Sequence, residues 1–268
     1  MKKKVLVLGA LLTTLCIILL SFINSEQEVT NQTDELAVKS APIYEPATVI
    51  PDNRPITQFV HDIGPRLNPI KKTDLDQANS FTDFIGSEHA DEIAAYQSLS
   101  VILLDGIEET DIRETGNTGE FTDAQKALIK SLPYSSNLVI WANYQKKNKV
   151  TGQLIDELWT PYLTVVPENQ ANYTKGKEEL IHYLKEGSKA ARIDIKENIL
   201  RPAKLHFTVT KMGAVEHVKL ERSSGYPAID KVMIELIQNA PHKWSAATNA
   251  QGEAVDQELV ISFGQLGC

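Results

Sequence analysis

Apolar residues in the second half of the chain recur at spacings that predict strands and helices. Every second residue of Leu205–Val209 is apolar, which predicts a half-buried strand, and Met212-Gly213 supplies the turn after it. From Ile229 the apolar residues recur at i, i+3, i+4, i+7 and i+8, which predicts an amphipathic helix that ends before Pro241. Gln257–Phe263 alternates again, and this pattern predicts the last strand.

The first half shows a similar succession of strand and helix signals. The apolar run Leu99–Leu104 ends at Asp105-Gly106, a turn signal. Thr122 and Gln125 have the spacing of a capping box and predict the start of a helix, which Pro133 ends. The remaining predicted elements are a hairpin of Leu138–Tyr144 with Trp159–Val166, a helix at Gly176–Glu186 and a strand at Val215–Leu220.

These elements predict an α+β fold in which short antiparallel sheets carry helices on one face. The two halves are also candidates for tandem copies, because both run through strand, turn, strand, helix and proline. An offset of 105 positions aligns Phe121 with Tyr226, Lys126 with Lys231, Leu128 with Met233 and Leu132 with Ile237. Since helix-plus-hairpin units recur by chance, a repeat also requires the same strand order in both halves.

The N-terminus has the pattern of a membrane segment. Lys2, Lys3 and Lys4 precede the uncharged run Val5–Ile23, which as a helix at ~1.5 Å per residue would cross about 28 Å of hydrocarbon. Positive charges before the run predict a cytoplasmic N-terminus, with the rest of the chain on the other side. We therefore expect a single-pass inner-membrane protein whose globular part lies in the periplasm. The alternative is a signal peptide that is cleaved after export.

The remainder divides into three parts. Residues 24–55 are polar, contain four prolines and lack apolar periodicity, so they predict a linker. The expected organisation is thus an anchor or signal segment at 1–23, a linker at 24–55, a first α+β unit at 56–170 and a second α+β unit at 171–268.

Composition and charge exclude some classes of protein. With 268 residues, 42% of them hydrophobic, the chain can bury a core. The net charge of −8 disfavours nucleic acid as the main partner, because affinity for phosphates comes from Lys and Arg. Cys16 and Cys268 are the only cysteines, so neither a disulfide framework nor a cysteine-based zinc site is expected.

Candidate catalytic and metal-binding residues do not form a known pattern. Ser223-Ser224-Gly225 lacks the Gly-x-Ser-x-Gly elbow of a nucleophile and is typical of a turn. His206 and His217 could approach each other across a hairpin, but two histidines alone make a poor metal site. Spacing cannot exclude a site built from distant residues, for which the candidates are His89, His182 and the cluster Glu108, Glu109 and Asp111. We expect no enzyme activity, no cofactor and no metal.

Trp244 follows the predicted end of a helix. Tryptophan often anchors protein interfaces, but a tryptophan in this position is more often packed over a helix–sheet core. We interpret Trp244 as a core residue.

Binding through a sheet edge is the function that the strand pattern favours. The last strand of such a sheet is naturally placed at an edge, where an extended peptide can add by main-chain hydrogen bonds. The predicted accepting strand is rich in β-forming residues and contains no proline. Its residues, which form the candidate peptide-binding site, are Gln257, Glu258, Leu259, Val260, Ile261, Ser262 and Phe263.

Several segments between about Arg201 and Phe263 resemble the C-terminal domain of TonB-family energy transducers, in the form seen in Bacteroidetes-type bacteria. The resemblance rests on Leu205–Val215 with its glycine at the turn, Val218–Gly225, Ile229-Asp230, Trp244 with Ala246-Ala247, and Gly252 before the last strand. Each segment alone is a weak signal, and their order and spacing make the resemblance more specific.

The resemblance implies a protein held in the inner membrane by one N-terminal helix. Its C-terminal domain would pair a strand, here Gln257–Phe263, with an extended segment of an outer-membrane transporter and pass on force from a proton-driven complex. The run Val5–Ile23 lacks the histidine that this family's membrane helix usually carries, and the linker is short. The alternative is therefore a scaffold or sensor ectodomain that binds another envelope protein without transmitting force. A homodimer is also left open.

If the last strand lies at an edge, its outer backbone groups are needed for partner binding and not for folding. We therefore expect that Val260→Pro or Ile261→Pro abolishes partner binding while the domain stays folded.

Overall fold

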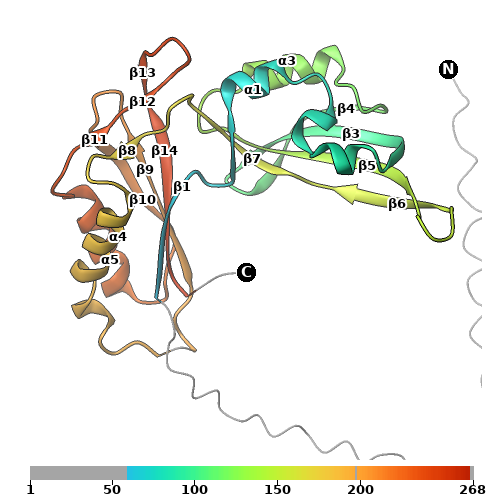
Figure 1. The fold of residues 1–268 in the computed structure, drawn as a ribbon. Helices are drawn as coiled ribbons and strands as arrows, with labels where there is room; N and C mark the ends of the chain where they lie inside the picture. The colour runs from blue at the N-terminus through green and yellow to red at the C-terminus, as the bar shows by residue number, and fades with distance from the viewer. Residues whose placement is uncertain (1–58, 197, 266–268) are drawn as a thin grey trace, which may run out of the picture. The chain divides into compact units, whose positions relative to one another are not determined.

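The computed structural model of the chain describes residues 59–196 and 198–265 (Figure 1). All of them belong to a unit that begins at Asn53. The expected anchor at 1–23, the linker at 24–55 and both cysteines lie outside the described residues. Within the described part of the chain, no helix has the length and hydropathy needed to cross a membrane.

One sheet has four antiparallel strands in the order β1-β14-β9-β10. The strands are β1 (Val60–Gly64), β14 (Gln257–Gly264), β9 (Pro202–Val209) and β10 (Val215–Arg222). Helices α4 (Lys177–Gly187) and α5 (Pro227–Gln238) accompany it, as does the short 3-10 helix η2 (Ala190–Arg192). Two small pairs join the loops around this sheet: β8 (Asn172–Tyr173) with β11 (Trp244–Ser245), and β12 (Ala247–Thr248) with β13 (Ala254–Val255).

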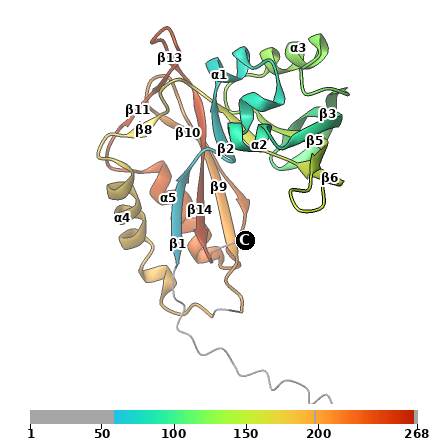
Figure 2. The same cartoon turned by 45° about the vertical axis from the view of Figure 1, so that its right-hand side comes forward.

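The core of the four-stranded sheet lies between its strands and the two helices, which Figure 2 shows on one face. Alternate residues of β9 and β14 point into this core, including Leu205, Phe207 and Ile261. The helices contribute apolar residues at helical spacing, among them Leu180, Leu184, Ile229, Met233 and Ile237. The apolar side chains that recur every two residues in the strands thus pack against those that recur every 3.6 residues in the helices.

The second sheet has its strands in the order β2-β7-β5-β3-β4, with β6 also paired to β5. All pairs are antiparallel except β2 with β7. The strands are β2 (Asn68–Lys71), β3 (Ile93–Asp105), β4 (Glu108–Gly116), β5 (Asn137–Lys147), β6 (Leu154–Trp159) and β7 (Tyr162–Val166). The helices are α1 (Lys72–Gln77), η1 (Phe81–Phe84), α2 (Ser87–Ala90) and α3 (Asp123–Ser131).

Helix α3 begins as the capping box predicts. The Thr122 hydroxyl accepts a hydrogen bond from the Gln125 amide, and the Gln125 side chain accepts one from the Thr122 amide. The buried Gln125 side chain also donates to the carbonyl of Leu99 at 2.7 Å, which ties the helix to β3. Ile129 and Leu132 pack with α1 and the strands in the core of this sheet.

The two sheets share one order of elements. Each contains a hairpin, a helix and a third strand that pairs beside the first strand of the hairpin: β3-β4-α3-β5 and β9-β10-α5-β14. The strand order that a tandem repeat requires is therefore present. Shared order alone does not demonstrate a common origin, so the repeat stays a prediction.

The α+β class, the mostly antiparallel strands and the interior position of Trp244 are confirmed. The expected boundary between the two units is wrong at one point. β1 lies within 56–170 in sequence but pairs with β14 in the four-stranded sheet. The sequence signal failed here because β1 is only five residues long and its partner lies near the other end of the chain.

The turn between β9 and β10 has no room for a side chain at Gly213. Its φ is +74°, and a Cβ atom there would lie 2.4 Å from the carbonyl oxygen of Trp244. Gly252 has a similar φ of +79°, but a Cβ atom would meet nothing within 4 Å. The two glycines therefore separate the cost of the backbone conformation from the cost of a clash.

We expect Gly252→Ala to lower the free energy of unfolding by about 1–2 kcal/mol, the usual cost of a left-handed alanine. Gly213→Ala should lower it by clearly more, because the Trp244 backbone must also move. Urea unfolding followed by tryptophan fluorescence measures both. Equal losses in the two variants would contradict the packing described at Gly213.

Candidate functional site

The predicted accepting strand, β14, lies in the interior of its sheet. It pairs with β9 along Gln257–Gly264 and, on its other side, with β1 along Val260–Gly264. The expectation of an open edge at Gln257, Glu258, Leu259, Val260, Ile261, Ser262 and Phe263 is therefore corrected. The last strand in sequence is not the last in space, because a segment from the start of the described chain returns to cover it.

The remaining part of β14 is held by other contacts. The Glu258 amide donates to the Ser135 hydroxyl at 2.9 Å. The buried Gln257 side chain accepts from the Ala171 amide at 2.7 Å and donates to the Gln170 side chain at 3.1 Å. Of the residues of β14, Leu259 alone has a neighbour on one side only and no side-chain anchor among the described residues.

This arrangement also changes the expected effect of proline. Val260 and Ile261 each have a strand on both sides, so a proline at either position removes a ladder hydrogen bond. We now expect Val260→Pro and Ile261→Pro to destabilise the four-stranded sheet.

β1 is fastened to the sheet at three points. Ile63 packs in the core. The exposed Asp62 forms an ion pair with Lys177 of α4 at 2.7 Å. Just after the strand, the side chain of Arg66 is 5% exposed and pairs with Glu221 of β10 and, at 3.3 Å, with Glu258 of β14.

The Arg66 pairs are more buried than the pair of Asp62 with Lys177. Burial disfavours the charged guanidinium, but the hydrogen bonds and charges of Glu221 and Glu258 outweigh it and raise the pKa of Arg66. Because Arg66 is nearly buried, removing its partners would leave a charge without compensation.

His61 is the poorly matched residue of β1. It is buried, its ring centroid lies 5.0 Å from that of Phe59, and neither ring nitrogen has a hydrogen-bond partner among the described residues. Burial, and secondarily the positive charges of Arg192 and Lys185, lower the pKa of His61 from 6.5 to about 4. The Nε atom of Arg192 is also buried without a partner in this part of the chain. The surroundings of His61 therefore carry positive charge, and no described group forms a hydrogen bond with either ring nitrogen.

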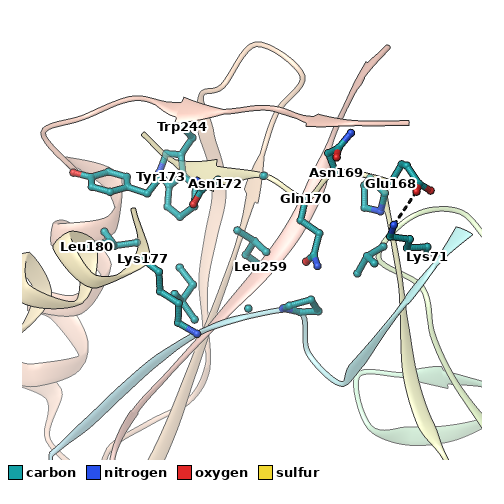
Figure 3. A pocket seen from close by; sticks show the side chains of 16 residues that line it. Lys71, Glu168, Asn169, Gln170, Asn172, Tyr173, Lys177, Leu180, Trp244 and Leu259 are labelled. Carbon is teal, nitrogen blue, oxygen red and sulfur yellow. Dashed lines mark hydrogen bonds and ion pairs between the residues drawn. The ribbon is translucent and has the colours of Figure 1, made fainter. Parts of the chain in front are cut away.

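A cavity of about 600 Å³ lies beside the end of β1 (Figure 3). Gly64 and Pro65, where β1 ends, line it together with Leu259 of β14. Its polar lining includes Asn169 and Asn172, and an ion pair of Lys71 with Glu168 at 2.8 Å lies at one side. An extended segment in the place of β1 could therefore run on into this space.

Tyr173 and Trp244 form the aromatic part of the cavity wall. Their ring centroids lie 5.5 Å apart, and Trp244 also packs on Phe207 at 5.3 Å. Both side chains are largely buried in the core, so they support the wall and offer little surface to a ligand.

Ser223 and Ser224 form hydrogen bonds that stabilise a turn. The Ser223 hydroxyl and the Ser224 amide both donate to the carboxylate of Asp230 in the first turn of α5. These hydrogen bonds fasten the turn before the helix, and they bring no histidine to the serines. This agrees with the interpretation of 223–225 as a turn.

The other candidates are not brought together. His206 lies beside Arg66 and Glu258, whereas His217 is exposed at a bulge of β10 with a φ of +54°. His89 packs on Trp159, and His182 is exposed on α4. Glu108, Glu109 and Asp111 lie exposed on β4. Among the described residues, no group of three His, Cys, Asp or Glu side chains could hold a metal ion.

Sequence reasoning did not find β1 or Arg66. The only local signal was the pattern Val60-His-Asp-Ile63, which is too short to distinguish from a loop. Arg66 carried no signal, because its two carboxylate partners lie 155 and 192 positions away.

Comparison with known proteins adds no relative. No family model matches the chain, and neither a curated protein nor a solved structure matches it.

The lowered pKa of His61 predicts an acid-sensitive sheet. Between pH 6.5 and about 4 the unfolded chain binds a proton at His61 that the folded chain does not, so stability falls as the pH falls through this window. The full shift corresponds to about 3 kcal/mol, at about 1.4 kcal/mol per pKa unit.

His61→Leu should remove this part of the pH dependence. It should also raise the free energy of unfolding at pH 7 by about 1–3 kcal/mol, because two unsatisfied nitrogens leave the core. Urea unfolding at pH 7 and pH 4.5 measures both effects, with His182→Leu on the exposed face of α4 as the control. Parallel pH profiles for wild type and His61→Leu would contradict the assignment.

Proposed function

We propose that this protein is a periplasmic binding protein that engages an extended segment of an envelope protein by adding it as a strand to β14. The partner class suggested by the resemblance to TonB-family transducers is an outer-membrane transporter. Binding requires that β1 leave its place, because the acceptor edge is occupied by the chain itself.

The observation that carries the proposal is the pairing of β1 with β14. An extended five-residue segment already adds to this edge as an antiparallel strand, with its side chains alternating between core and solvent. Strand addition of this kind derives affinity from main-chain hydrogen bonds and specificity from alternate side chains. The segment is short, and one of its two inward side chains, His61, has no hydrogen-bond partner.

The residues around β1 also indicate which side chains a replacing segment would need. A replacing segment needs an apolar residue at the position of Ile63, which packs in the core. At the position of His61, a carboxylate would face Arg192 and Lys185 and would supply the acceptor that the site lacks. The cavity beyond Gly64 leaves room for the segment to continue.

The other edge of the same sheet suits a partner less well. β10 departs twice from regular pairing with β9, and it carries exposed charged residues such as Glu216, Lys219 and Arg222. Bulges and charges are the devices by which proteins close sheet edges to added strands. We therefore place the partner at β14.

A disulfide between β1 and β14 tests the proposal. Asp62 and Ser262 lie directly opposite each other, so Asp62→Cys with Ser262→Cys can lock β1 in place. The background carries Cys16→Ser and Cys268→Ser. The immobilised full-length chain is offered outer-membrane and inner-membrane extracts, before and after reduction.

We expect the reduced protein to retain an outer-membrane transporter, identified by mass spectrometry, and the oxidised protein to lose it. Each single-cysteine variant serves as a control for the substitutions. Capture of the same proteins by both forms would reject β14 as the binding strand. Capture of inner-membrane proteins alone would favour a scaffold or sensor domain.

A further inference from the structure

β6 is an edge strand that carries two charged residues, Asp156 and Glu157, but is protected by neither a proline nor a bulge. Its only strand neighbour among the described residues is β5, with which it pairs regularly from Leu154 to Trp159. Other described edges are less suited to adding a strand: β2 contains Pro69, and the β3–β4 pair that ends at the other edge has a register shift.

The pairing with β5 fixes which backbone groups of β6 point outward. Asn148 donates to the carbonyl of Gln153 at one end of the pairing, and Ile140 donates to the carbonyl of Pro161 at the other. Because hydrogen-bonded pairs alternate in an antiparallel ladder, the odd-numbered residues of β6 face β5. The N–H and C=O groups of Leu154, Asp156 and Leu158 therefore face away from it.

Exposed apolar side chains gather on the same hairpin. Leu154 is 54% exposed and Leu158 is 50% exposed, and Ile155 and Val150 are also exposed. The described chain has nine large exposed apolar residues, and four of them lie on this hairpin. The hairpin therefore carries a cluster of exposed apolar side chains, which often marks an interaction site. Leu154 and Leu158 lie on the same face of the sheet, with Asp156 between them.

The Oδ2 atom of Asp156 accepts no hydrogen bond from the described residues. The amides of Gln97 and Gln145 both donate to its Oδ1 atom, at 2.8 and 2.9 Å. Both partners are uncharged. Glu157, by contrast, is paired with Lys146 at 2.8 Å. On the Leu154–Leu158 face, Asp156 is thus the charged residue of β6 itself, next to an added strand; Lys147, opposite Leu154, lies one strand further away on β5.

A second copy of the chain fits this edge poorly. Outward-facing residues pair with outward-facing residues, so the symmetric antiparallel register that uses all three of them places Asp156 opposite Asp156. Like charges directly opposite each other destabilise a sheet, and each copy carries a net charge of −8.

We propose that β6 is a second strand-addition site, for an extended segment of another protein in which a Lys or Arg is flanked at both second neighbours by apolar residues. The basic residue pairs with Asp156 Oδ2, and the two apolar residues cover Leu154 and Leu158. This site is independent of the proposed exchange at β14, from which it differs in sheet, strand and preferred charge.

Two labelled peptides test the site in fluorescence anisotropy titrations with the full-length chain. The first is acetyl-Thr-Leu-Thr-Lys-Thr-Leu-Thr-amide, and the second has Glu in place of Lys. We expect the Lys peptide to bind at least about fivefold more tightly than the Glu peptide, from one charge pair gained and one repulsion avoided. Asp156→Asn should bring the two affinities to within about twofold, whereas Asp111→Asn on the exposed edge β4 should leave the preference unchanged.

Leu158→Pro removes an outward N–H group and an apolar contact without removing a hydrogen bond to β5, and should abolish binding of both peptides. Circular dichroism checks whether Leu158→Pro is folded. If this variant is unfolded, Asp156→Asn alone tests the site. Equal affinities for the wild type, a preference that persists in Asp156→Asn, or no saturable binding would overturn the proposal. So would a wild-type dimer in sedimentation velocity that Leu158→Pro dissociates, which would make a second copy the occupant.

Discussion

The pairing of β1 with β14 is the interaction on which the four-stranded sheet and its candidate site depend. β14 carries alternate core residues, Leu259, Ile261 and Phe263, so its backbone lies at the centre of the buried layer. A strand in that position needs hydrogen-bond partners on both sides. β9 supplies one side, and the other is supplied by a segment that precedes the whole second sheet in sequence. The edge where a partner strand would add is therefore closed from within.

The attachment of β1 to the sheet includes one unfavourable residue, His61, and one ion-paired residue, Arg66. His61 is buried, has no hydrogen-bond partner among the described residues and lies within the influence of the positive charges of Lys185 and Arg192. Arg66, immediately after the strand, is bound by Glu221 and Glu258 of the same sheet. A segment that replaced β1 would gain stability by placing a better-matched side chain at the position of His61. It would also have to leave the ion pairs of Arg66 intact or replace them. In the proposed exchange, the balance of these two contributions would decide how readily β1 leaves β14.

The two sheets handle their edges differently, and this difference separates the two proposed sites. In the four-stranded sheet, one edge is covered by a short strand and the other is bulged and charged. In the second sheet, β6 is regular, exposed and apolar on the face that carries Asp156. Exchange at β14 favours an acidic segment, whereas addition at β6 favours a basic one. The two proposed sites would therefore select partners of opposite charge.

Local patterns in the sequence determined the α+β class, the capping box of α3, the amphipathic helix α5 and the alternating strands β9 and β14. Each of these signals arises from neighbours in the chain, through backbone hydrogen bonds or the period with which side chains face a core. Only the tertiary structure decided which strands lie at an edge. The residues of β1 that pair with β14 lie 196 to 204 positions away from their partners, and Arg66 lies 192 positions from Glu258. A five-residue strand carries no pattern strong enough to predict such a pairing.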